Sequence, residues 1–203
     1  STHGHVFYGY FCKLKTVFFL SVERLTARIT YRITTLTNLE IEDYKKLGLA
    51  NQEKFIALPY GIDTEDFRRS EVARDKLRSA LGISPQDKII GWVGRLVPVK
   101  DCETFLDAAS IVKDLPDINF LIVGDGIWKE KIANFAKNNN LNFVFAGLVP
   151  PSEVCRYTPF MDVLLHLSLR EGLPRAVVQA LASGKPAIAF NLDGTPEVVL
   201  DGK

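Results

Sequence analysis

Short apolar runs alternate with helix-like segments from about residue 71 to the end of the chain. We expect strands at 88–93, 119–123, 142–145, 163–167 and 187–190, and helices at 72–81, 102–113, 128–137, 152–157 and 175–182. A continuous apolar run is typical of a parallel strand that is buried on both faces. The alternation therefore predicts an α/β fold with a Rossmann-like, doubly wound parallel sheet.

Residues 1–65 have a different pattern, in which a long helix precedes short elements. The long helix, expected at 10–32, has apolar residues on one side and a set of regularly spaced arginines on another. These two sets are Phe18, Leu25 and Ile29, and Arg24, Arg28 and Arg32. The later elements are expected to be strands at 33–36 and 55–58, a helix at 39–47 capped by Asn38, and a linker at 62–70. We therefore divide the chain into residues 1–65, including the start of the linker, and residues 66–203, which contain the doubly wound sheet.

The arginine set on the long helix has two interpretations. A solvated helix face is the expected one, because charged side chains usually line the exposed side of a domain helix. The alternative is a peripheral contact with anionic lipid at the inner face of a membrane.

The composition narrows the class of protein. The 203 residues carry a formal net charge of +1, which gives no electrostatic reason to expect nucleic acid as a partner. Three widely separated cysteines indicate buried thiols in a reducing compartment. No apolar run approaches the roughly 20 residues that span a bilayer, and no signal peptide is visible, so we expect a cytoplasmic protein. The chain lacks an initiator Met, and we expect it to be a piece of a longer protein.

Glycines follow most of the predicted strands, at the sheet edge where doubly wound folds bind ligands. Gly94 and Arg95 follow the strand at 88–93, and Lys100 comes shortly after them. Two cations at one strand end can neutralise a diphosphate, Arg through its planar fork and Lys as a point charge. Gly124 and Gly126 follow the next strand and allow a backbone to approach a ligand closely. An ordinary solvated loop is the alternative for each of these motifs alone.

A carboxylate, Glu171, lies just before the helix expected at 175–182. Pro174 suits the first turn of that helix and Gly184 suits its end. The free N–H groups of a helix N-terminus bind phosphate oxygens, and a neighbouring carboxylate accepts hydrogen bonds from hydroxyl groups. The pair fits a nucleotide sugar, and Gln179 lies about two helical turns further along, near the same face.

Other chemistries find no support in the motifs. No Ser-His-Asp order, metal-ligand cluster or Walker loop is present, so no metal site is expected. His166 lies on an apolar strand and is interpreted as a core histidine. Glu197 follows Gly194-Thr195-Pro196 and is interpreted as structural.

Taken in order, the motifs resemble those of the family-four glycosyltransferases, which have the GT-B architecture of two facing Rossmann-like domains. The passages are Thr2-His3-Gly4, Pro59-Tyr60-Gly61-Ile62-Asp63 with Phe67, Val93-Gly94-Arg95-Leu96 with Lys100, Val123-Gly124-Asp125-Gly126, Phe145-Ala146-Gly147, Glu171-Gly172-Leu173-Pro174, and Ala182-Ser183-Gly184-Lys185-Pro186. The resemblance implies a hexosyltransferase that moves a sugar from a nucleotide-sugar donor to a glycan or lipid-linked acceptor. It also implies retention of configuration and no need for a metal or other cofactor.

The same resemblance implies roles for single residues. The catalytic set would be Arg95 and Lys100 on the donor diphosphate, Glu171 on a donor-sugar hydroxyl, and His3 facing the transferred sugar. The remaining donor-binding residues would be Gly94, Gly124, Gly126, Leu148, Val149, Gly172, Leu173 and Gln179, with Leu148 and Val149 beside the base.

The sequence departs from the family pattern in two respects. Gln179 stands where the family usually has a second Glu on the ribose hydroxyls, and an amide can accept a hydrogen bond but supplies no charge. The resemblance also implies that 1–65 is the end of the acceptor-side Rossmann-like domain with its linker, and that 66–203 is the nucleotide-sugar-binding Rossmann-like domain, truncated at its C-terminus. Most of the acceptor-side domain would then be absent, so the isolated chain is expected to be inactive. Two alternative functions remain open, a GT-B sugar-nucleotide epimerase and a non-catalytic nucleotide-sugar-binding module, and Gln179 favours the second.

Overall fold

The computed structural model describes residues 12–69 and 74–202, which divide into two compact units. The larger unit contains the described residues of Ile62–Leu169 together with Arg175–Phe190. The smaller unit contains the described residues up to Gly61, together with Arg170–Pro174 and 191–202. The chain therefore passes between the two units repeatedly.

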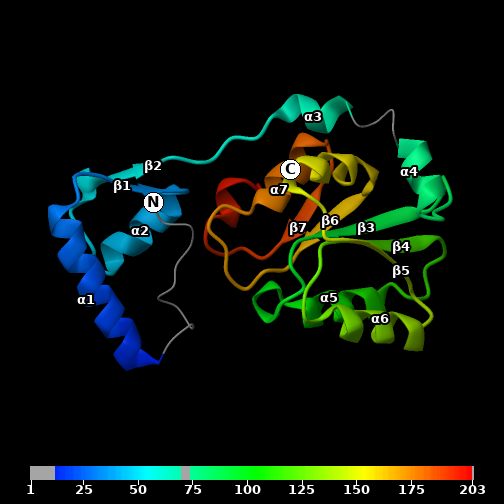
Figure 1. The fold of residues 1–203 in the computed structure, drawn as a ribbon, viewed down its shortest axis with the longest axis horizontal. Helices are drawn as coiled ribbons and strands as arrows, with labels where there is room; N and C mark the ends of the chain where they lie inside the picture. Colours follow the sequence, from blue (N-terminus) through cyan, green and yellow to red (C-terminus); the bar gives the residue numbers. More distant parts are fainter. Residues whose placement is uncertain (1–11, 70–73, 203) are drawn as a thin grey trace. The chain divides into compact units, whose positions relative to one another are not determined.

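The larger unit is built on a parallel sheet of five strands with the order β5-β4-β3-β6-β7 (Figure 1). The strands are β3 (Lys88–Val93), β4 (Ile118–Val123), β5 (Asn142–Gly147), β6 (Val163–His166) and β7 (Ala187–Ala189). The chain runs outward from β3 to β5 and then returns to the other side of β3, where it forms β6 and β7. Such a reversal creates a crevice at the carboxyl ends of the central strands. The expected doubly wound α/β fold class is confirmed.

Helices cover both faces of this sheet. Figure 1 shows α5 (Cys102–Ile111) and α6 (Lys129–Asn138) on one face and α7 (Arg175–Ala182) on the other. The segment expected to be a helix at 152–157 is a 3₁₀ helix, η4 (Pro151–Arg156), and the one expected at 72–81 is observed as α4 (Arg74–Ala80).

The segment 62–70, expected to be a linker, contains the helix α3 (Thr64–Arg69), and the change from the smaller to the larger unit falls at its start. The Asp63 side chain accepts a hydrogen bond from the Glu65 N–H at 3.1 Å, which satisfies a free donor at the helix start. Phe67 is buried, and α3 packs against α7. Tertiary burial of one aromatic side chain thus orders a segment whose composition looks like that of a loop.

The core of the larger unit is aromatic on the face of α5 and α6. The rings of Phe120 and Phe143 stack with centroids 4.5 Å apart, and the Trp92 and Phe105 rings meet edge-on at 5.0 Å. On β3, Gly91 makes room for the buried Met161, since a Cβ at position 91 would lie 2.0 Å from the Met161 sulfur. The close packing fixes the sheet from which the strand-end loops project.

The smaller unit combines two helices with a pair of parallel strands (Figure 1). Its elements are α1 (Lys13–Ile29), β1 (Ile33–Thr35), α2 (Asn38–Lys46) and β2 (Phe55–Ala57). The Tyr44 ring of α2 stacks on the Phe55 ring of β2 at 6.0 Å, and both side chains are buried. The long helix ends at Ile29 and not at 32, because Thr30 is already extended. Its expected start at residue 10 lies outside the described residues.

The N-terminus of α2 corrects a second prediction. Thr37, and not Asn38, is the cap, because its hydroxyl accepts a hydrogen bond from the Glu40 N–H at 3.1 Å. The Glu40 carboxylate accepts in return from the Leu36 N–H at 2.9 Å, a reciprocal arrangement typical of Thr-x-x-Glu at a helix start. Asn38 instead donates to Glu197, which also accepts from the N–H of Leu39 at 2.6 Å. Glu197 thus holds the start of α2.

The apolar and basic sides of α1 are both exposed. Phe18, Leu25 and Ile29 are exposed, and Ala27 is the only residue of α1 that is buried. Of the arginines, Arg24 and Arg32 are also exposed, but each donates hydrogen bonds to backbone carbonyls in the region of 47–53. Within 12–69 and 74–202, no helix has the length and apolar character needed to cross a membrane.

Candidate functional site

A cavity of about 230 Å³ opens at the carboxyl ends of the central strands of the larger unit. Its lining comes from four segments, which are Val93, Gly94 and Arg95 after β3, Val123, Gly124 and Asp125 after β4, Leu148, Val149, Pro151 and Val154 after β5, and Arg175 and Gln179 on α7. The location is the one expected for a ligand in a doubly wound sheet. The lining combines an apolar side with a few polar groups, as small-molecule sites usually do.

Backbone hydrogen bonds join the loops that form this cavity. The N–H of Gly94 donates to Val123, and the N–H of Gly124 donates to Gly147, at 2.9 and 2.8 Å. Gly124 has a φ of 144°, and a Cβ there would lie 2.0 Å from the Gly94 carbonyl oxygen. A side chain at 124 would therefore separate two loops that now touch, so the glycine sets the spacing of the cavity wall.

The two cations predicted for the diphosphate both follow β3, and only Arg95 is in the cavity lining. Lys100 ends the short helix η3 (Pro98–Lys100), and its Cε lies 3.9 Å from the position that a Gly94 Cβ would occupy. Both side chains thus follow β3 and lie at one strand end, where a guanidinium and an ammonium group can offset the charge of an anionic ligand.

Two titratable groups at this edge of the sheet have shifted pKa values. A hydrogen bond from Lys129, at 2.9 Å, lowers the pKa of Asp125, and the N–H of Gly126 adds to the effect. This carboxylate in the cavity wall is therefore ionised and already neutralised by its own partner. Burial raises the pKa of the Cys102 thiol to about 11, with a further contribution from Asp101, so Cys102 is a neutral packing residue and not a nucleophile. Cys12 is exposed and Cys155 is only partly buried, so the expectation of buried thiols is correct for Cys102 and wrong for Cys12.

Gln179 is the most informative side chain in the lining. It is only 6% exposed, and its side-chain amide makes no hydrogen bond with any residue that the structure describes. The amide is not among the fully buried side-chain atoms that lack a partner in the described residues, so it is accessible from the cavity, where a ligand or water can bind it. Arg175 lies one helical turn earlier on the same helix and also lines the cavity. The sequence analysis missed Arg175, although its spacing of four residues from Gln179 was a usable signal.

The loop that carries Glu171 belongs to the smaller unit. The Glu171 N–H donates to the Asp193 carboxylate at 2.8 Å, and Arg170 lies 3.9 Å from the same carboxylate. The N–H of Gly194 donates to Gly172 at 3.1 Å. The turn at 193–194 thus fixes the backbone of the Glu171 loop, a function of Asp193 that the sequence analysis did not assign.

The structure therefore brings together only part of the predicted site. Six predicted residues line the cavity of the larger unit, namely Gly94, Arg95, Gly124, Leu148, Val149 and Gln179. Lys100 and Gly126 adjoin it through Gly94 and the Asp125 carboxylate. Glu171, Gly172 and Leu173 lie in the smaller unit, where the Leu173 carbonyl accepts a hydrogen bond from the Tyr60 hydroxyl. His3 lies outside the described residues, and the roles of all these residues stay predictions.

Comparisons with known proteins give the family. The family model described as "Glycosyl transferases group 1" matches residues 73–203, which is more than half of the chain. The larger unit described above has a doubly wound α/β fold, and the chain belongs to the glycosyl transferases group 1.

Similar proteins of known name fall in the same class. The chain is 28% identical over 198 residues to UDP-Gal:alpha-D-GlcNAc-diphosphoundecaprenol alpha-1,3-galactosyltransferase of Escherichia coli, covering 96% of this chain and 51% of that protein. It is 30% identical over 185 residues to 2-deoxystreptamine glucosyltransferase of Streptomyces kanamyceticus, covering 88% and 47%. The chain spans about half the length of these curated relatives.

Solved structures show the same fold. Anabaena Alr3699/HepE in complex with UDP superposes with a TM-score of 0.78 at 20% identity, over 90% of this chain and 52% of that one. WaaG, a glycosyltransferase involved in lipopolysaccharide biosynthesis, superposes with a TM-score of 0.69 at 22% identity, over 82% and 48%. The expected GT-B type of fold is confirmed by these neighbours.

Proposed function

We propose that this chain is the nucleotide-sugar-binding part of a glycosyltransferase that transfers a hexose from a nucleotide sugar to a glycan or lipid-linked acceptor, with retention of configuration. UDP is the first nucleotide to test, because relatives are named for UDP-galactose and the similar HepE structure contains UDP. An acceptor of this class has its parallel in the diphosphoundecaprenol-linked sugar named for the E. coli relative.

The observation that carries the proposal is the cavity at the carboxyl ends of the central strands. Its lining includes the amide of Gln179, which makes no hydrogen bond with a described residue, and the guanidinium of Arg95. The amide can bind the hydroxyls of a ribose, and Leu148 and Val149 offer apolar surface to a base. A nucleoside diphosphate has hydroxyls, a flat base and phosphate charges, and so matches all three features.

In the proposed reaction, the bond between the sugar and the β-phosphate breaks while the sugar becomes oxocarbenium-like. Negative charge then accumulates on the departing diphosphate, and Arg95 and Lys100 stabilise it electrostatically. The family resemblance assigns Glu171 to a donor-sugar hydroxyl and His3 to the side of the acceptor. The proposed reaction needs no metal, so turnover by the full-length protein should persist in the presence of a chelator. The proposal also includes a cytoplasmic location.

Calorimetry with UDP tests the cavity assignment on the chain itself. Arg95→Ala and Lys100→Ala should each weaken UDP binding at least about tenfold, since charge-assisted bonds to phosphate are the strong ones. Lys137→Ala is the matched control, because it removes an equal charge from the exposed end of α6. Unchanged affinity in both cavity variants would exclude this cavity as the diphosphate site.

A non-catalytic nucleotide-sugar-binding module is the second candidate, favoured by the neutral Gln179. The full-length protein separates the candidates when it is incubated with labelled UDP-sugars and a panel of acceptors. Transfer of the label supports the glycosyltransferase. Tight binding without turnover supports the binding module, and release of UDP with an altered sugar but no transfer supports the epimerase.

A further inference from the structure

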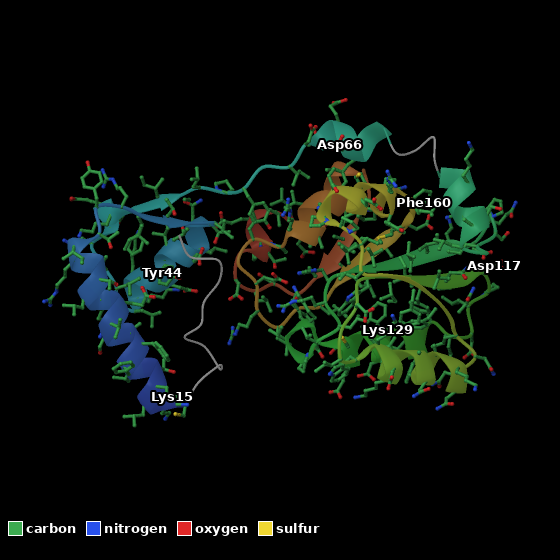
Figure 2. All side chains as sticks on the ribbon, viewed as in Figure 1. Lys15, Tyr44, Asp66, Asp117, Lys129 and Phe160 are labelled. Carbon is green, nitrogen blue, oxygen red and sulfur yellow. The ribbon has the colours of Figure 1, made fainter. Side chains whose placement is uncertain are left out.

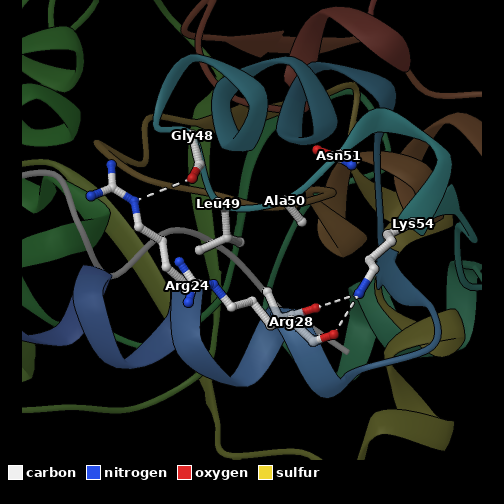
Figure 3. A pocket seen from close by; sticks show the side chains of 8 residues that line it. Arg24, Arg28, Gly48, Leu49, Ala50, Asn51 and Lys54 are labelled. Carbon is white, nitrogen blue, oxygen red and sulfur yellow. Dashed lines mark hydrogen bonds between the residues drawn. The ribbon is translucent and has the colours of Figure 1, made fainter.

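The smaller unit contains a second cavity, which shares no residue with the one described above. It has a volume of about 430 Å³ and lies between α1 and the segment that follows α2. Figure 3 shows Arg24 and Arg28 on the α1 side, the Gly48–Asn51 segment opposite them, and Lys54 at one end. Three of its eight lining residues are thus basic, and none is acidic.

Two of the three basic side chains in this cavity, those of Arg24 and Lys54, donate hydrogen bonds to backbone carbonyls. Arg24 donates to the carbonyls of Leu47 and Gly48, at 2.6 and 3.2 Å, just after α2. Lys54 donates from Nζ to three carbonyls at the end of α1, those of Ala27, Arg28 and Thr30, at 2.7 to 2.9 Å. The guanidinium of Arg28 has no acceptor among residues 12–69 and 74–202.

The charge in this cavity is not balanced by these contacts. A helix C-terminus carries roughly half a negative charge, so two of them offset about one of the three cations. Within the described parts of the chain, neither arginine nor Lys54 has a carboxylate partner. Arg24 and Arg28 are also four residues apart on one helix, a spacing at which like charges destabilise each other. An anion between them would relieve this repulsion.

A phosphate group fits the donors that this cavity offers. Guanidinium groups bind phosphate through two parallel hydrogen bonds, and Arg28 has its whole guanidinium available in the described structure. The volume falls in the range of small-molecule sites and exceeds what an inorganic ion needs, and Ala27 and Leu49 add apolar surface. We propose that this cavity is a second anion site, which binds the phosphate group of a phosphate ester.

Arg28 gives the cleanest test, because its guanidinium takes part in no described hydrogen bond that holds the fold. The whole chain is used in an Arg95→Ala, Lys100→Ala background, so that phosphate binding at the first cavity does not contribute. Binding of inorganic phosphate is followed by calorimetry. Arg28→Ala should lower the affinity at least fivefold, and Arg28→Glu should abolish binding. Lys15→Ala removes an equal charge from an exposed part of the same helix (Figure 2) and should change the affinity for phosphate less than twofold.

Two further probes distinguish the sources of the phosphate group. Glycerol 3-phosphate represents a soluble ester, and vesicles of phosphatidylglycerol represent a lipid headgroup. Binding of either probe that depends on Arg28 supports the site and names its source. The proposal is overturned if no probe shows saturable binding, or if Arg28→Ala and Lys15→Ala reduce binding equally, since the latter would reflect only net charge.

Discussion

The two cavities of this chain are both rich in cations, but they are built by different means. In the larger unit, backbone hydrogen bonds and a close glycine contact at Gly124 hold the strand-end loops together. In the smaller unit, the side chains of Arg24 and Lys54 bind the backbone at helix ends. The comparison teaches that the role of a basic residue in a cavity depends on which groups it binds.

The largest change in stability is expected for a substitution at Gly124, which tests whether the close backbone contact holds the wall of the first cavity. Gly124→Ala places a Cβ against the Gly94 carbonyl in a conformation that disfavours a side chain, so we expect a loss of about 3–5 kcal/mol in the free energy of unfolding. Gly147→Ala is the matched control. It also has a positive φ, of 74°, but a Cβ there meets nothing within 4 Å, so the loss should be about 1 kcal/mol. Urea denaturation measures both, and equal losses would mean that the close contact does not matter.

The next largest change in stability is expected from removing a buried guanidinium, that of Arg78, compared with removing the exposed one of Arg24. Arg78 is 3% exposed, donates to the carbonyls of Ser84, Pro85 and Asp87, and lies 3.7 Å from the Asp162 carboxylate. Arg78→Met should cost about 3 kcal/mol, because three part-buried carbonyls lose their donor and Asp162 loses one of the two cations described beside it, Lys88 being the other.

Arg24→Met removes two carbonyl contacts at the exposed surface of the smaller unit and should cost about 1 kcal/mol. Thermal unfolding of both variants gives the order of the two losses. A larger loss of stability for Arg24→Met would show that the exposed hydrogen bonds of Arg24 contribute more than the contacts of the buried Arg78.

A smaller effect concerns the amide in the first cavity. Gln179→Glu should keep the fold, since both residues form helices well. It should raise UDP affinity about threefold, because a charged acceptor binds ribose hydroxyls more strongly and Arg95 offsets its repulsion from the diphosphate. Calorimetry with UDP and with 2′-deoxy-UDP on both proteins checks this. If neither protein distinguishes the two nucleotides, Gln179 does not contact the ribose.

The smallest expected effect is the pH dependence of the Asp125–Lys129 pair. The hydrogen bond from Lys129 lowers the folded pKa of Asp125 below its usual value of 3.8. The pair therefore stabilises the fold above that value and loses its effect as the pH falls through the folded pKa. Lys129→Met should return the pKa of Asp125 toward 3.8, as followed by NMR titration of the carboxyl carbon. Lys131→Met, which breaks an ion pair with Glu103 elsewhere on α6, should leave the pKa of Asp125 unchanged.

Local patterns were sufficient for the order of elements. Continuous apolar runs such as 88–93 predicted buried parallel strands, and the structure contains β3 there. Glycines after strands predicted the edge of the sheet where a ligand binds, and Gly124 lies in the cavity wall there, with a φ that disfavours a side chain. The boundaries were less accurate, since the cap at Thr37 and the helix at 64–69 depend on Glu40 and on the burial of Phe67.

The sequence by itself thus determined the fold class, the family resemblance and the cations that follow β3. Only the tertiary structure decided which partners each polar group has. It placed Arg175 beside Gln179 in one cavity and left the Gln179 amide without a described hydrogen bond. It also joined the Glu171 loop to the turn at Asp193, which lies 22 residues later in the chain, through a hydrogen bond from the Glu171 N–H to the Asp193 carboxylate. The physical reason is that periodicity reports burial of a helix face or strand, whereas hydrogen-bond partners far apart in sequence are fixed only when the elements pack.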